Sequence, residues 1–481
     1  MFKNKKPGSA SNVKVKTDTK THKTPVAESA KMAQKKRSLE TKPAQGRATE
    51  DQGTRVVEKA MNKSSWITDN HTAVKRDLFV TESSDDKSWA EKIVSSKQLV
   101  DLETKHYKPC EWCLSHRRCL IASDFDDLDA ETVFPSIQLQ MPGGVSEEYY
   151  LAVPKNKDNY SPIHDLMTTV TLMLDWFIPS SFSHIFGANI QLGEEFYTMY
   201  EGCIRRRIQR AFNRRDGKGF VDAVSDFNAE FNKITKDEHV RDYMISREGV
   251  PPELWMHICN QTYQRVIGPK VHDLRNYEAF SSNIYGEIMP SFVAHLAQRL
   301  KIGPQRSFID LGAGVGNLVL QMSLATGCSS FGVEQMAIPA ELAFLQLSEG
   351  RARSSLYGYK TGEMDFEAGD FCNSQKLTKK LANSWKGDVI LINNSFSAEL
   401  NERLSLLFLD LKDNVKIVSL KPFLPHNFRI TDATVDSPLA ILRMETGDYF
   451  PGSVSWTDKG GTYYIHTVDR SAVRNYLRMR Y

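Results

Sequence analysis

Residues 307–316 read SFIDLGAGVG, and this stretch decides the fold that the sequence predicts. Its first half, Ser307–Leu311, is a short apolar run typical of a buried strand, and residues 317–325 have the pattern of a helix. Between the two, glycines recur at every second position, which allows a tight turn and lets a ligand approach the backbone. The stretch therefore predicts an open α/β sheet with a ligand site at the carboxyl end of its first strand.

Acidic residues follow the next two predicted strands. The run Ser329–Glu334 ends on a carboxylate that can accept hydrogen bonds from both hydroxyls of a ribose. The run Met364–Ala368 leads into Asp370 and Phe371, which can accept from an adenine amine and stack on its ring. Together these positions predict a site for an adenine nucleoside.

Further apolar runs complete the predicted sheet. Residues 388–392 form a fourth strand that ends at Asn393, and residues 415–420 form a fifth. Residues 439–444 and 462–468 predict a final pair, the last strand antiparallel. The predicted fold is α/β: the seven-stranded class I S-adenosylmethionine-dependent methyltransferase fold.

Two details favour S-adenosylmethionine over a dinucleotide as the cofactor. The glycine spacing is G-x-G-x-G, whereas dinucleotide-binding turns read G-x-G-x-x-G. In addition, Asp310 precedes the first glycine, where a carboxylate can meet the ammonium group of a methionine moiety but would repel a pyrophosphate. A nicotinamide enzyme and a cofactor-free doubly wound domain are the alternatives.

The amino-terminal segment has a different composition. Residues 1–64 contain 16 Lys or Arg and 6 Asp or Glu, a net charge of +10, so the remaining residues carry −7 of the total of +3. Phe2 is the only aromatic residue before Trp66. Such a segment buries too little apolar surface to fold alone, so a disordered basic arm is predicted over residues 1–85. We expect it to bind nucleosomal DNA through its phosphates; a nuclear-localisation tail or a solvated linker is the alternative.

In the middle of the chain, the sequence predicts a linker of uncertain structure over residues 86–147 and a mainly helical subdomain over residues 148–280. Helices are expected at 166–178, 194–215, 220–231 and 252–266, and the second of these carries an arginine face that could touch phosphate. The methyltransferase domain is predicted over residues 281–481. No run of eighteen apolar residues occurs, and the first residues have no signal-peptide pattern, so neither membrane association nor secretion is expected.

One cysteine cluster stays without a role. Three thiols and an imidazole fall within CEWCLSHRRC, at Cys110, Cys113, His116 and Cys119. Zinc modules usually hold two ligand pairs with a folded loop between them, and no second pair follows here. We therefore expect reduced cysteines and no metal site.

Several motifs together resemble one family, the non-SET histone H3 lysine-79 methyltransferases associated with disruption of telomeric silencing, of the fungal type. The motifs are NIYGEIMPSF, FIDLGAGVGNLVLQ, FGVEQM, AGDF, INNSF and SVSWTDKGGTYYIHTVDR, within residues 280–470. The resemblance implies transfer of methyl groups from S-adenosylmethionine to lysine 79 of histone H3 on the nucleosome, in the nucleus, as part of chromatin silencing. A ubiquitinated histone is a further partner to be considered.

The resemblance also implies roles for individual residues. It places these residues at the cofactor: Tyr285, Gly286, Glu287, Ile288, Phe308, Asp310, Leu311, Gly312, Gly314, Gly316, Asn317, Glu334, Asp370, Phe371 and Asn393. It places Asn393, Tyr463 and Tyr285 at the methyl-transfer centre, and Phe396, Trp456 and Tyr463 along the lysine channel. The family's Asn-Asn-Phe run reads Asn-Asn-Ser here, so either Phe396 takes the vacated place or the channel is wider.

Two other functions are weighed against this one. The run Asn393-Asn394-Ser395-Phe396 has a faint likeness to the Asn-Pro-Pro-Phe run of adenine amino methyltransferases, but both prolines are absent. The other alternative is a chromatin-binding protein that keeps the fold without catalysis. The intact glycine turn, Glu334 and Asp370 argue against this second alternative.

Overall fold

A seven-stranded sheet forms the carboxyl-terminal half of the chain. The computed structural model describes residues 87–110, 134–188, 202–247, 249–271, 274, 287–385, 387–393 and 398–480. The strands are β5 (Ser307–Leu311), β6 (Ser329–Glu334), β7 (Met364–Ala368), β8 (Val389–Ile392), β9 (Lys416–Ser419), β10 (Leu442–Tyr449) and β11 (Gly461–Val468). Their order across the sheet is β10-β11-β9-β8-β5-β6-β7. β11 alone runs opposite to the other six strands, so the predicted strands, including the antiparallel last one, are confirmed. The strand predicted over 439–444 begins at Leu442, because residues 438–441 form a turn.

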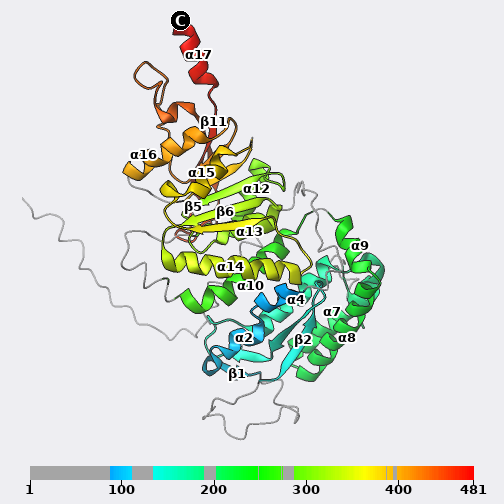
Figure 1. Cartoon of the computed structure of the whole chain (residues 1–481). Coiled ribbons are helices and arrows are strands. Elements are labelled where there is room, and N and C mark those ends of the chain that lie inside the picture. Colours follow the sequence, from blue (N-terminus) through cyan, green and yellow to red (C-terminus); the bar gives the residue numbers. More distant parts are fainter. Residues whose placement is uncertain are drawn as a thin grey trace, which may run out of the picture. The chain divides into compact units, whose positions relative to one another are not determined.

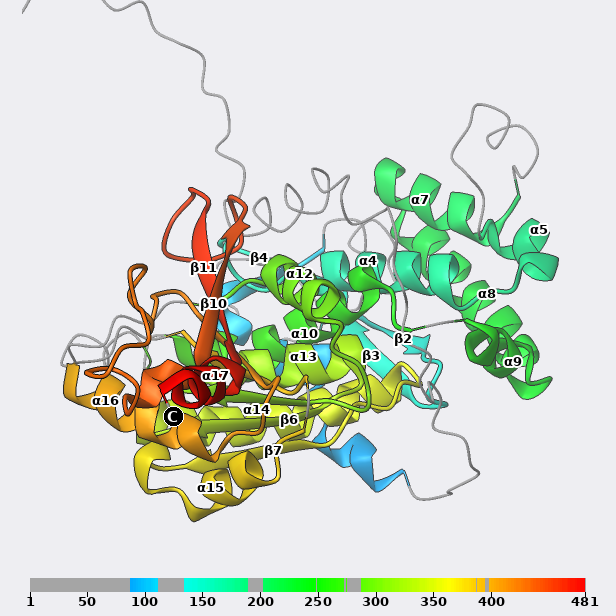
Figure 2. The same cartoon turned by 90° about the horizontal axis from the view of Figure 1, so that it is seen from above.

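Helices cover both faces of this sheet (Figures 1 and 2). Alternate residues of β5 divide between two hydrophobic clusters, because successive side chains of a strand point to opposite faces. Phe308 packs with one set of helices and Ile309 with the other. The first set includes α12 (Pro290–Leu300), α13 (Asn317–Thr326) and α14 (Ala337–Leu356); the second includes α15 (Gln375–Ala382) and α16 (Ala398–Leu407). α17 (Ser471–Arg480) follows the last strand, and short turns η5 (Phe371–Asn373), η6 (Phe408–Asp410) and η7 (Pro438–Ile441) complete this half.

The amino-terminal half combines helices with two small antiparallel sheets. Strand β1 (Tyr107–Pro109) pairs with β4 (Ala152–Pro154), and β2 (Ser136–Gln140) pairs with β3 (Ser146–Tyr150). The helices are α2 (Ser96–Asp101), α4 (Pro162–Trp176), α5 (Ser183–Phe186), α7 (Ile204–Arg214), α8 (Gly217–Lys236), α9 (His239–Ser246) and α10 (Pro252–Val266), with turns η1 (Ser88–Lys92), η2 (Thr104–His106), η3 (Ser180–Phe182) and η4 (Gly268–Lys270). The segment expected as a linker thus holds regular elements.

Helix α7 differs from its expected bounds. The spacing predicts one helix over 194–215. Residues 189–201 lie outside the described residues, and beyond them α7 begins at Ile204 because Cys203 is extended. The expected arginine face consists of Arg205, Arg206, Arg210 and Arg214. Of these, Arg205 forms an ion pair with Asp175, so the face is partly neutralised by the chain itself.

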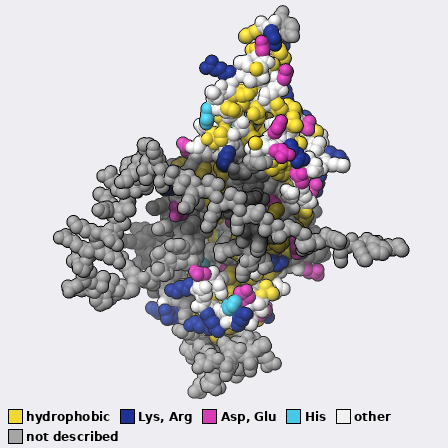
Figure 3. All heavy atoms as spheres, turned by 90° about the vertical axis from the view of Figure 1, so that its left-hand side faces the viewer, with side chains coloured by type: hydrophobic (Ala, Val, Ile, Leu, Met, Phe, Trp, Pro, Cys, Tyr) yellow, Lys and Arg dark blue, Asp and Glu magenta, His cyan; other side chains and the backbone are white. Residues whose placement is uncertain are grey.

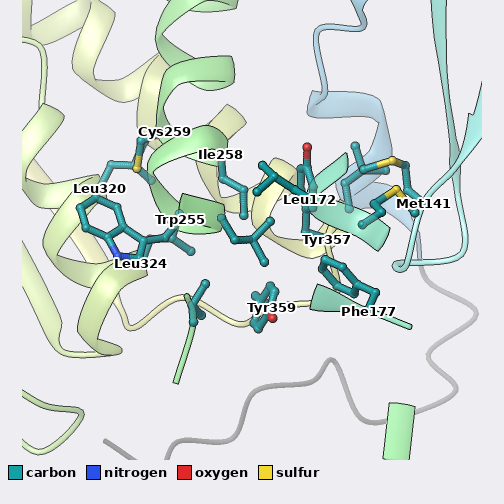
Figure 4. Packing of buried hydrophobic residues seen from close by; sticks show 14 of the residues in the cluster. Met141, Leu172, Phe177, Trp255, Ile258, Cys259, Leu320, Leu324, Tyr357 and Tyr359 are labelled. Atoms are coloured by element: carbon teal, nitrogen blue, oxygen red, sulfur yellow. The ribbon is translucent and has the colours of Figure 1, made fainter. Parts of the chain in front are cut away.

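Helix α10 joins the two halves. Trp255 and Cys259 of α10 lie beside Leu320 and Leu324 of α13, and Ile258 turns toward the residues of the amino-terminal half (Figure 4). One continuous hydrophobic cluster therefore runs from β2 through α4 and α10 to the sheet. Since α13 follows the glycine turn directly, the amino-terminal half supports the element that carries the turn.

A buried ionic network reinforces the same junction. Arg265 of α10 contacts Glu147 at 2.9 Å and Asp165 at 2.7 Å. Arg353 of α14 contacts Glu147 at 3.0 Å and Glu349 at 2.6 Å. Burial opposes the charge on Glu147, but the two guanidinium groups hold the pKa of this carboxyl below its ordinary value. The network fixes β3, α4, α10 and α14 in one arrangement.

Candidate cofactor and substrate site

The turn after β5 has the backbone geometry that its glycines predict. Gly312, Gly314 and Gly316 have φ angles of +82°, +54° and +80°, a region that residues with side chains rarely adopt. The amide groups of Gly312 and Ala313 both donate to the carbonyl of Val333, at 2.9 Å. The turn is therefore tied to the end of β6.

Glu334 lies against this turn. Its Oε2 accepts a hydrogen bond from the amide of Gly314 at 2.9 Å, and its Oε1 accepts from Met336 at 2.8 Å. Each carboxylate oxygen keeps a further lone pair, so the group can still accept hydrogen bonds from a ligand. The predicted ribose partner is thus held rigidly beside the glycines.

Asp310 is a buried carboxylate at the end of β5. Asp310 is only 2% exposed, and its Oδ1 has no hydrogen-bond partner among the described residues. Burial and the neighbouring charge of Glu334 raise the pKa of Asp310 to about 8. A positively charged ligand group would stabilise the ionised form, as an ammonium group does.

A second segment meets the start of α13. Glu287 Oε1 accepts a hydrogen bond from Asn317 Nδ2 at 3.0 Å, and Asn317 in turn accepts from Gln346 at 2.7 Å. Glu287 and Ser455 exchange two hydrogen bonds, at 2.8 and 2.9 Å. Ile288 forms a bridge with Val454. The predicted loop over the methionine end therefore lies next to the segment that leads into Trp456.

The adenine-side residues sit after β7. Asp370 Oδ1 accepts from the amide of Cys372 at 2.9 Å and Oδ2 from Asn373 at 2.8 Å, and Arg403 of α16 approaches to 3.8 Å. Phe371 is buried in the cluster on the α15 and α16 face. Its stacking on adenine stays a prediction.

Asn393 and Tyr463 lie at the same level of the sheet. Ile392 of β8 and Tyr464 of β11 both pair with Ser419 of β9. Asn393 follows Ile392, and Tyr463 precedes Tyr464 on the antiparallel strand, so both residues lie level with Leu420. At about 4.8 Å per strand their backbones are about 10 Å apart. Leu391 and Ile465 belong to one hydrophobic cluster and therefore lie on one face of the sheet. Asn393 and Tyr463 are each two residues away from them, so their side chains point to that same face.

The remaining predicted residues are distributed as follows. Trp456 is 42% exposed, whereas Phe308, Leu311 and Ile288 are buried. Tyr285, Gly286, Phe396, Cys113, His116 and Cys119 lie outside the described residues, as does the predicted arm, and Cys110 is buried.

Sequence reasoning missed three residues of this site: Gln346, Ser455 and His295. Ser455 lies inside the motif SVSWT, so its position in that motif was the available signal. Gln346 and His295 lie on helices, where no spacing distinguishes them from ordinary surface positions. His295 Nε2 is 2.9 Å from the Tyr463 hydroxyl.

Three features define a class I methyltransferase fold. They are the strand order with a reversed strand between β9 and β10, the glycine turn, and the acidic residues at the ends of β6 and β7. The family model described as "Histone methylation protein DOT1" matches residues 263–468. Over these residues the chain is similar to this family, and the resemblance inferred from the motifs is confirmed.

Three fungal relatives carry the name "Histone-lysine N-methyltransferase, H3 lysine-79 specific". The protein of Mycosarcoma maydis is 44% identical over 281 residues, which are 57% of this chain and 35% of that protein. The protein of Yarrowia lipolytica is 35% identical over 336 residues, 69% of this chain and 65% of that protein. For Aspergillus fumigatus the values are 35% over 340 residues, 70% and 65%. The chain thus covers 35–65% of the length of these relatives.

Solved structures resemble the chain only weakly. An RNA methyltransferase from Salinibacter ruber in complex with S-adenosyl-L-homocysteine gives a TM-score of 0.23 at 16% sequence identity. That alignment covers 37% of this chain and 92% of the other. Within the described residues, no helix is long and apolar enough to cross a membrane.

Proposed function

We propose that this chain is a histone-lysine N-methyltransferase that transfers methyl groups from S-adenosylmethionine to lysine 79 of histone H3 in nucleosomes. The observation that carries the proposal is the meeting of two segments far apart in sequence. Residues 287–289 pair with residues 453–455, and Glu287 also bonds Asn317 beside the glycine turn. The candidate cofactor cradle and the candidate lysine channel therefore share one wall.

The residues present fit the cofactor. Asp310 offers a buried carboxylate for an ammonium group, and Glu334 keeps lone pairs for ribose hydroxyls. Asp370 stands at the predicted adenine end. The glycines add no side chains to the cradle, and their positive φ angles disfavour any residue that would. When bound, S-adenosylmethionine supplies a methyl group on a positively charged sulfonium.

For the lysine, the protein's task is positioning and deprotonation. The amine of the substrate lysine, whose unperturbed pKa is about 10.4, must lose its proton before it attacks. Apolar and aromatic walls disfavour the ammonium form, so a channel beside Trp456 would lower the pKa of the substrate amine. Aligning the two reactants can lower the activation barrier by about 7–11 kcal/mol.

Nucleosome binding combines two kinds of surface in this proposal. On one face of the protein, Lys and Arg side chains gather in one region and hydrophobic side chains in another (Figure 3). The tip of the α7–α8 hairpin adds the exposed Arg214, Arg215 and Lys218. With the arm at residues 1–64 these groups would engage nucleosomal DNA, and a ubiquitinated histone would be a further contact. The proposed location is the nucleus.

The test is methyl transfer from labelled S-adenosylmethionine to intact nucleosomes, free histone H3 and naked DNA, side by side. Nucleosomes with arginine at position 79 of H3 are the control. We expect label on H3 only in intact nucleosomes and none on the control. Label on DNA would favour an adenine amino methyltransferase, and cofactor binding with no label anywhere would favour a silent chromatin-binding protein.

A further inference from the structure

The hydroxyl of Tyr463 points at helix α12. Its oxygen is 2.9 Å from His295 Nε2, and the positive charge of Arg299 acts on the same hydroxyl. A guanidinium carries donors only, so the hydroxyl presents its oxygen to Arg299 and its hydrogen is left for His295. His295 and Arg299 both lie on α12.

The ring of Tyr463 is held as firmly as its hydroxyl. The residue is fully buried, and Phe292 packs on it edge to face with ring centroids 5.1 Å apart. Phe292 also stacks on His295, at 6.1 Å and an interplanar angle of 24°. On the other side, a Cβ atom at Gly447 would lie 2.5 Å from Tyr463 Cζ, so only glycine leaves room for the ring. Figure 2 shows α12 beside β10 and β11.

We propose that His295 is a positioning residue for methyl transfer, which accepts the hydrogen bond of the Tyr463 hydroxyl and so fixes the buried Tyr463 ring behind the lysine channel. This inference rests on the proposed function and deepens it. Because its hydroxyl is committed to α12 and its ring is buried, Tyr463 supports the residues that line the channel, and it does not accept the proton of the substrate lysine.

The electrostatics agree with this direction of the hydrogen bond. Burial and the nearby Arg299 lower the pKa of His295, so its ring is neutral near pH 7 and Nε2 can accept. Burial raises the pKa of Tyr463, which stays a neutral phenol. The other groups that face the pair are Asp448 of β10, whose charge acts on Tyr463, and the ring of Phe450, 6.3 Å from His295.

The test measures kcat and the KM for S-adenosylmethionine on nucleosomes for His295→Leu, His295→Gln, Tyr463→Phe and the double variant His295→Leu/Tyr463→Phe. His164→Leu, at an exposed histidine of α4, is the matched control. Thermal unfolding checks that each variant is folded. An intramolecular hydrogen bond of ordinary strength corresponds to about 3- to 10-fold in rate.

We expect His295→Leu to lower kcat about 3- to 10-fold with the KM for S-adenosylmethionine within about twofold, and His295→Gln, which keeps an acceptor, to recover most of kcat. The double variant should match Tyr463→Phe, because both changes act through one hydroxyl. Equal kcat in His295→Leu and the wild type, or additive losses in the double variant, would overturn the inference alone. No transfer by the wild type would overturn the proposed function with it.

Discussion

The buried network at the junction of the two halves gives a quantitative prediction. Replacing Arg353 by Met keeps most of the volume of the side chain but removes its charge and its hydrogen bonds. Arg353 is fully buried and bonds Glu349 at 2.6 Å, Glu147 at 3.0 Å and the carbonyl of Val94 at 2.9 Å. Glu147 retains Arg265 in the variant, but among the described residues Glu349 has no other cationic partner.

Removing one partner of a buried ion pair costs about 3–5 kcal/mol, because a charge is left buried without compensation. For a folded unit of this size the melting temperature shifts by about 1–1.5 °C per kcal/mol, so Arg353→Met should lower it by about 3–8 °C. The control is Arg241→Met, which breaks an exposed pair with Glu238 and should cost about 0.5 kcal/mol or less. Thermal unfolding followed by circular dichroism measures both.

A loss in Arg353→Met no larger than that in Arg241→Met would refute the reasoning. It would mean that the network stabilises the junction no more than a surface pair does. The junction would then depend on the continuous cluster through α10 alone, which still predicts that a fragment beginning at residue 281 is insoluble.

Three further predictions concern the proposed site and partners. Gly312→Arg should abolish cofactor binding by calorimetry, because φ is +82° there, whereas Gly202→Arg, with open space around it, should bind normally; binding by the first variant would contradict the cradle assignment. Deleting residues 1–64 should weaken nucleosome methylation and its salt dependence at unchanged cofactor affinity, and equal activity would remove the arm from the proposal. The pKa of Asp310 is raised in the folded protein, so its contribution to stability is present at low pH and is lost as pH rises toward about 8. The buried His257 and His466, whose pKa values are lowered to about 4, act with the opposite sign below about pH 6.5, so the wild type is compared with Asp310→Asn. Without cofactor, the melting temperature of the wild type relative to this variant should fall between pH 5 and about 8, as measured by calorimetry, and a constant difference would exclude Asp310 as the source.

Local sequence determined the elements whose signals are short in range. The strand Ser307–Leu311, the turn glycines and the helix Pro252–Val266 were all predictable, because apolar periodicity and glycine spacing act within about one element. The fold class followed from the glycine turn, the acidic strand ends and the number of predicted strands, whereas the order of the strands in the sheet came from the structure. The start of α7 at Ile204 was not predictable, since the apolar spacing continues beyond the residue where the backbone becomes extended.

Only the tertiary structure decided which distant side chains meet. Arg353 and Glu147 are 206 positions apart, and the pairs His295–Tyr463 and Glu287–Ser455 are each separated by 168. No local pattern records such pairs, because each depends on how whole helices and strands pack. The sequence by itself determined a methyltransferase sheet and its glycine turn. Packing of α10, α12 and α14 decided what supports that turn and where the hydroxyl of Tyr463 points.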